Sequence, residues 1–202
     1  MKENKKADNL IPTQYLGSKI DVSEKIVTTN ATQASAWFRK ASERLLDVNS
    51  WGSFANLSEF QLTDTSGERI FRTACEKDYI RIDIPGPGTK AGKGYDWVRI
   101  EEIRFDESPD EEILVMTVRP SAHPASKDNI PAHFLGCSAT STFLVKRKGL
   151  EIFVEEHGRN ELINTKQRNL SDTARNFAVG LAAKLGLSYP QWNALVKGIL
   201  EK

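Results

Sequence analysis

The sequence predicts an α+β fold in which a curved antiparallel β-sheet is wrapped around a long C-terminal helix. From Glu59 to Glu156, short segments alternate apolar and polar residues, which is typical of strands with one buried face. Ser171–Leu185 repeats apolar residues at helical spacing, which predicts an amphipathic helix. The alternation changes phase once, near Glu101–Glu102, which indicates a bend. The apolar face of such a sheet needs a cover, and this helix is the candidate.

Composition indicates an ordinary globular chain. Its 202 residues are 39% hydrophobic and 27% charged, which suits one domain with a real core. Residues 1–20 are polar and lack periodicity, so we expect a flexible N-terminal arm followed by a single domain over residues 21–202.

Charge and hydropathy exclude several classes of protein. A net charge of +1 leaves no basic field for nucleic acid. No apolar run is long enough for a secretory signal or a membrane span. Without a signal, Cys75 and Cys137 are expected to be reduced and semi-buried, which favours a cytoplasmic protein. The sequence sets no oligomeric state.

The first elements are a strand over Ser23–Thr28 and a helix to about Asp47. Asn30 is typical of a helix N-cap, with Gln33 three residues later as its capping-box partner. The irregular connector Asn49–Leu57 then carries Trp51 and Phe54. These aromatic residues either close one end of the core or line the mouth of a cavity.

The strands that follow differ in how they are buried. Tyr79–Pro85 places three isoleucines on one face, as expected for a sheet with one wet face. In Tyr95–Phe105, a β-bulge near Glu101–Glu102 would return the later apolar residues to the same face. Ile113–Arg119 is almost continuously apolar, which predicts a central strand.

Motifs for chemistry are weak. The Gly-rich loop Pro85–Gly94 has two lysines, but a strand follows it rather than a helix, so a hairpin loop is favoured over a phosphate site. His123, His133 and His157 match no metal-ligand spacing, and we expect neither metal nor cofactor. The polar cluster His157–Glu161 either performs acid–base chemistry or simply ends a strand.

The element order resembles the START-like, Bet v 1-like (SRPBCC) superfamily, also called the helix-grip fold. The resemblance rests on the strand and helix around Lys25–Asp47, the connector LLDVNSWGSF, the strands to Glu156 and the helix from Ser171. It covers roughly residues 22–200 and implies an apolar pocket between sheet and helix. A break near Leu187–Pro190 departs from the pattern. The superfamily includes lipid carriers, polyketide cyclases, hydroxylase components and chaperone activators, so membership would not set function.

Three functions remain open. The favoured one is non-catalytic binding or carriage of a small apolar molecule, lipid- or polyketide-like, in that cavity. The expected lining residues are Trp51, Phe54, Ile82, Val98, Met116, Phe143, Phe177 and Leu181. A cyclase- or hydrolase-type enzyme would need inward ionisable groups, from the His157–Glu161 cluster or from Arg81, Asp83, Arg99, Glu101 and Arg119. A protein-interaction module would instead have a filled core, which uses the same alternation.

Overall fold

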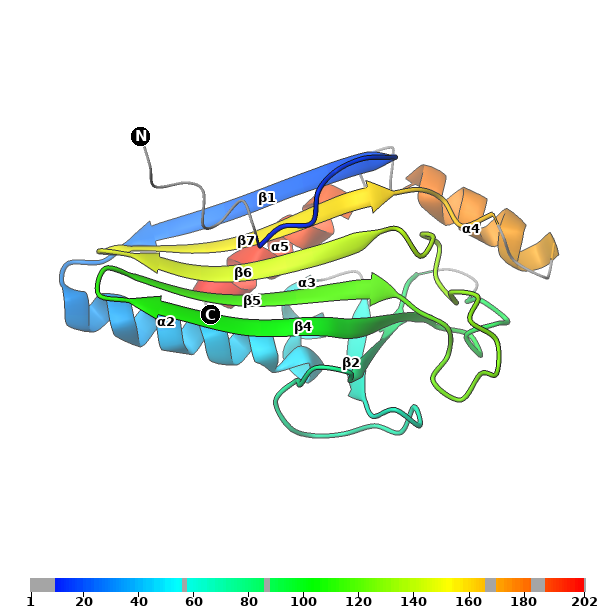
Figure 1. Cartoon of the computed structure of the whole chain (residues 1–202), viewed down its shortest axis with the longest axis horizontal. Helices are drawn as coiled ribbons and strands as arrows, with labels where there is room; N and C mark the ends of the chain where they lie inside the picture. Colours follow the sequence, from blue (N-terminus) through cyan, green and yellow to red (C-terminus); the bar gives the residue numbers. More distant parts are fainter. Residues whose placement is uncertain (1–9, 56–57, 86–87, 166–169, 183–187, 202) are drawn as a thin grey trace.

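The computed structural model describes residues 10–55, 58–85, 88–165, 170–182 and 188–201, and contains one seven-stranded antiparallel sheet. The strand order is β1-β7-β6-β5-β4-β3-β2 (Figure 1). The strands are β1 (Ser18–Val27), β2 (Glu59–Thr63), β3 (Tyr79–Asp83), β4 (Asp96–Ser108), β5 (Glu111–Pro120), β6 (Thr140–Lys148) and β7 (Glu151–Glu161).

Helices occupy one face and one end of this sheet. They are α2 (Ala31–Leu46), the 3-10 turn η1 (Val48–Ser50), α3 (Gly52–Ala55), α4 (Leu170–Ala182) and α5 (Ser188–Glu201). The helix α2 begins as expected, because Oδ1 of Asn30 accepts a hydrogen bond of 2.9 Å from the Gln33 amide. Among the described residues, no helix is long and apolar enough to cross a membrane.

The strand β5 lies at the centre of the sheet, as its apolar sequence predicts. On the inner face, Leu114 and Met116 join the main core. On the outer face, Ile113 and Val115 pack with Leu10 in a smaller cluster. The strand is apolar on both faces because both are covered. Part of the segment before β1 thus lies against the sheet.

The predicted β-bulge is present in β4. Ile100 pairs with Val118 and Glu102 pairs with Thr117, so Glu101 is the extra residue. Beyond the bulge, Ile103 packs against the same core as Ile100, which strict alternation would not allow.

The C-terminal helix that covers the sheet, beside α2, is α5, and the expectation that residues 171–185 would do so is wrong. Leu195, Val196, Ile199 and Leu200 of α5 are at most 1% exposed, and α5 packs on β1, β7 and α3. In α4, by contrast, Ala174 and Ala178 of the expected apolar stripe are exposed. The sheet wrapped around a C-terminal helix is therefore as predicted, with a different segment as the helix.

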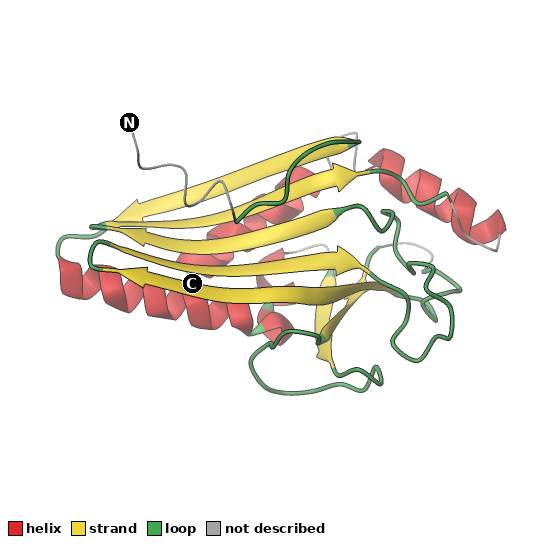
Figure 2. Ribbon diagram, viewed as in Figure 1, coloured by secondary structure: helices red, strands yellow, loops and turns green. Residues whose placement is uncertain are grey.

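The helix α4 lies beyond the end of the sheet, where several connecting loops gather (Figure 2). Its buried residues are polar: Asp172, Arg175 and Asn176. They contact loops rather than the apolar face of the sheet, which explains why the apolar stripe does not determine how α4 packs. Cys75 and Cys137 are free but exposed, which corrects the expectation that they are semi-buried.

Candidate functional site

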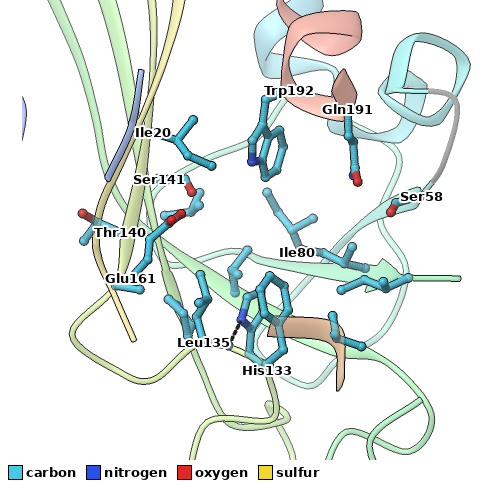
Figure 3. Close-up of a pocket in the computed structure, with 18 of the residues that line it drawn as sticks. Ile20, Ser58, Ile80, His133, Leu135, Thr140, Ser141, Glu161, Gln191 and Trp192 are labelled. Atoms are coloured by element: carbon cyan, nitrogen blue, oxygen red, sulfur yellow. Dashed lines mark hydrogen bonds between the residues drawn. The ribbon is translucent and has the colours of Figure 1, made fainter. Parts of the chain in front are cut away.

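A cavity of about 820 Å³ lies between the inner face of the sheet and α5 (Figure 3). Its floor comes from β3, β4, β5 and β6, its side from β1 and the end of β7, and its cover from α5. Most lining side chains are apolar, including Ile20, Ile80, Ile82, Ile84, Val98, Val118, Leu135, Ile163 and Val179.

Four aromatic side chains form one wall of the cavity. The ring of Phe143 lies 5.0 Å from that of Trp51 and 5.6 Å from that of Trp192, centroid to centroid. Phe60 lies 5.5 Å from Trp51. The indole N–H of Trp51 donates to the carbonyl of Leu45 at 3.2 Å, so its polar atom is satisfied and its ring presents an apolar surface. Trp51 therefore both fills the core and lines the cavity.

The structure separates the predicted lining residues into three groups. Trp51, Ile82, Val98 and Phe143 lie on the cavity wall. Phe54 and Met116 do not. Phe54 lies against Gly198 of α5, where an added Cβ would be 2.5 Å from the Phe54 Cβ, and Met116 is fully buried in the core. The side chains of Phe177 and Leu181 lie outside the described part of the structure. Ligand binding by any of these residues stays a prediction.

His133 lies at one end of the cavity, beside Leu135 (Figure 3). Its Nδ1 accepts a hydrogen bond of 3.0 Å from the Leu135 amide, so the neutral ring carries its proton on Nε2. Burial lowers the pKa of His133 to about 4, while Asp96 opposes the shift and Arg175 adds to it. The imidazole is therefore uncharged at neutral pH. Sequence spacing alone gave His133 no role.

A buried polar network holds the His133 loop in place. Asp96 pairs with Arg175 and accepts from the Phe134 amide at 3.0 Å. The Asn176 side-chain amide donates to the carbonyls of His133, at 3.3 Å, and Asn164, at 3.1 Å. Through these contacts, α4 and the loop that carries His133 together close one end of the cavity.

The Gly-rich segment between β3 and β4 does connect two antiparallel neighbours, as expected of a hairpin loop, and its described residues 88–94 are anchored to the rest of the protein. Thr89 is fully buried, and its hydroxyl donates to the carbonyl of Tyr95 at 2.8 Å. The amides of Lys90 and Ala91 donate to the carboxylate of Asp172, at 2.9 and 3.1 Å. These N–H groups are the ones a phosphate loop would offer to an anion, and here a carboxylate of α4 occupies them.

The polar cluster His157–Glu161 divides between the two faces of the sheet. His157 lies between Asp21, at 2.6 Å from Nδ1, and Glu155, at 3.0 Å from Nε2. Arg159 also pairs with Asp21, at 2.6 Å. Of this cluster, only Glu161 lines the cavity. Arg81, Asp83, Arg99, Glu101 and Arg119, the other candidates for catalytic groups, are also absent from its wall.

Glu161 is the carboxyl group of the cavity wall. The Ser18 hydroxyl lies 3.5 Å from its Oε2, and Ser18 and Ser141 also line the cavity. Burial raises the pKa of Glu161, although the Ser18 hydroxyl and Arg159 oppose the shift. The neighbouring Glu156 is fully buried, and burial together with the charge of Glu161 raises its pKa well above the usual range.

Comparison with known proteins finds similarity in solved structures alone. No protein-family model matches the chain, and no curated protein matches it. A hypothetical protein from Helicobacter pylori aligns with 95% of this chain and 92% of its own at 13% identity, with a TM-score of 0.49. A STAR-related lipid transfer protein from Xanthomonas axonopodis aligns over 89% and 85% at 11% identity, with a TM-score of 0.42. Norcoclaurine synthase from Thalictrum flavum aligns over 92% and 88% at 8% identity, with a TM-score of 0.40.

Similarity at this level does not carry a function from one protein to another. The strand order, the bulged β4 and the position of α5 against β1 and β7 define the architecture by themselves. The chain therefore has a helix-grip architecture, an antiparallel sheet with α5 as the helix that it holds.

Proposed function

We propose that this protein binds or carries a small apolar molecule, lipid- or polyketide-like, in the cavity between the sheet and α5, without transforming it. The observation that supports this is the cavity itself. Its volume of about 820 Å³ and its largely apolar, aromatic wall are typical of small-molecule sites. A filled core would use the same residue pattern but would leave no such space.

The alternative is a cyclase- or hydrolase-type enzyme in the same cavity, and one observation favours it. His133 and Glu161 both line the wall, and both have shifted pKa values, as catalytic acids and bases often do. Among the described residues, the remaining ionisable side chains of the lining are Lys19 and Tyr189. Lys19 is directed to Asp21, with 3.6 Å between its Nζ and Oδ2.

The partner that we propose is a small molecule. The net charge of +1 is close to neutral and gives no support to nucleic acid binding. The two free, exposed cysteines suit a reducing compartment, which supports a cytoplasmic location.

Native mass spectrometry of the purified protein, compared with its denatured mass, tests for a retained ligand. Binding constants for a panel of lipids and polyketides follow from quenching of the tryptophan fluorescence, since Trp51 and Trp192 line the cavity. A bound molecule recovered unchanged supports carriage, whereas a recovered product supports the enzyme.

A matched pair of variants shows whether binding occurs in the cavity. Val118 lines it, whereas Val27 is 66% exposed outside it. Val118→Phe should weaken binding at least about tenfold with little loss of stability, because the added ring enters empty space. Val27→Phe should leave binding unchanged. If Val118→Phe unfolds the protein and no panel member binds the wild type, the core is filled and the proposal fails.

A further inference from the structure

Gly158 of β7 makes room for the carboxyl group of Glu161 in the cavity wall. A Cβ atom added at Gly158 would lie 2.7 Å from Oε1 and 3.2 Å from Cδ of Glu161. Gly158 pairs with Ile20 of β1 and with Ser141 of β6, and both of these residues line the cavity. The carboxyl group of Glu161 thus occupies the space that a side chain at position 158 would need.

The acceptor oxygens around this position exceed the donors. The Ser18 hydroxyl lies 3.5 Å from Oε2 of Glu161, which is a long hydrogen bond. Glu156 lies two residues before Gly158 in β7, with its side chain fully buried. The Ser141 hydroxyl is a nearby donor that opposes the rise in the pKa of Glu156, but neither carboxyl oxygen forms a hydrogen bond of usual geometry among the described residues. Such groups are costly to bury unless a donor reaches them.

The nearby cations are directed elsewhere. Arg159 donates to the carbonyl of Ile20 at 3.0 Å and pairs with Asp21. Lys19 has a side chain that is 61% exposed and is also directed to Asp21. Within the described ranges, no side-chain cation forms an ion pair with Glu161 or Glu156. This end of the cavity can therefore accept hydrogen bonds and positive charge.

Resting on the proposed function, we infer that the ligand has an apolar body and a hydrogen-bond-donating end, an ammonium or hydroxyl group, that binds against the carboxyl group of Glu161. A ligand carboxylate would add a third acidic group beside Glu161 and Glu156. In these apolar surroundings it could bind only if Glu161 were also held in its protonated form, which lowers its affinity relative to a ligand that donates a hydrogen bond. The raised pKa values of both glutamates reflect the same setting. The site therefore selects against free fatty acids.

Three ligands of equal length separate these cases: decylamine, decanol and decanoate, at pH 7. Their dissociation constants are measured from tryptophan fluorescence. Decylamine and decanol should bind at least about tenfold more tightly than decanoate, equal to about 1.4 kcal/mol. Equal affinities, or tighter binding of decanoate, would overturn the inference while leaving the proposed function standing. If none of the three binds, and the lipid and polyketide panel also gives no binding, the proposed function itself fails.

Two variants assign the preference to Glu161. Glu161→Gln should reduce the preference for decylamine over decanoate at least about tenfold, because it replaces the acidic group by a neutral amide that can also donate to a carboxylate. Gly158→Ala should reduce it in the same direction, because its Cβ displaces the flexible end of Glu161 without changing any charge. The control Glu102→Gln changes an exposed glutamate of β4 and should leave the preference unaltered.

Each variant is first checked by circular dichroism and thermal melting. If Glu161→Gln fails to fold, Gly158→Ala carries the test alone. Retention of the full amine preference in a folded variant of either kind would show that Glu161 does not hold the polar end.

Discussion

Arg175 of α4 and Asp96, the first residue of β4, form a buried ion pair. Nη2 of Arg175 lies 2.8 Å from Oδ1 of Asp96, and Nη1 lies 3.1 Å from Oδ2. The two side chains are 5% and 0% exposed. Because Asp96 also accepts from the Phe134 amide, this pair holds both α4 and the His133 loop at the end of the cavity.

Replacing one partner of this pair should be strongly destabilising. Arg175→Met leaves the buried carboxylate of Asp96 without its cation, and we expect a loss of about 3–5 kcal/mol in the free energy of unfolding. Denaturation in urea measures it. The control is Arg104→Met, because Arg104 pairs with Asp106 at 2.7 Å while 48% exposed and should cost less than about 1 kcal/mol. Similar losses in the two variants would contradict a structural role for the buried pair.

A second prediction concerns which helix stabilises the sheet. Leu195 of α5 is fully buried, so Leu195→Ala should cost about 2–5 kcal/mol through lost burial and the cavity that it leaves. Ala178 of α4 is exposed, so Ala178→Asp should cost less than about 1 kcal/mol despite its charge. Both values follow from thermal or chemical denaturation. The reverse order would show that α4, and not α5, packs under the sheet.

The third prediction is a pH dependence of stability due to His133. Its pKa is about 4 in the folded protein, against 6.5 for an ordinary histidine. As pH falls below about 6.5, the unfolded chain binds a proton that the folded protein does not. Stability is therefore lost between about pH 6.5 and 4, by up to about 3 kcal/mol from this group.

The variant His133→Asn should flatten the stability profile in that range, because an asparagine oxygen can accept from the same amide without titrating. The matched control is His123→Asn. Nδ1 of His123 likewise accepts, at 3.0 Å, from the amide two residues later, but this imidazole is only partly buried. Burial lowers the pKa of His123 as well, so this variant should change the slope in the same direction but by less. An unchanged slope in His133→Asn would show that other groups cause the pH dependence.

Several features of the fold could be predicted because they depend on neighbours in sequence. The phase change at Glu101–Glu102 is visible in the alternation itself, and it becomes the bulge of β4. The continuous apolar run of Ile113–Arg119 requires cover on both faces, which is the situation of a central strand. Asn30 caps α2 through contact with a residue three positions away.

The position of Glu161 could not be predicted in the same way. A glycine inside a strand often marks close approach by another group, and Gly158 was such a signal. The sequence does not show which group approaches Gly158. This depends on the irregular backbone after Gly158, where Asn160 has a φ of +57°. This irregular backbone brings Glu161 back over the strand. The alternation of apolar and polar residues in the sequence does not reveal such a change of direction.

By itself, the sequence determined the fold class, the bulged and central strands, and a C-terminal helix against an antiparallel sheet. Each of these depends on local periodicity, which hydrophobic burial enforces. The tertiary structure alone decided that α5 rather than α4 covers the sheet, because Asp172 and Arg175 bind groups about 80 residues earlier in the chain. It also decided that a cavity remains under α5, because a packed core and a lined pocket require the same apolar residues and differ only in how closely the elements approach.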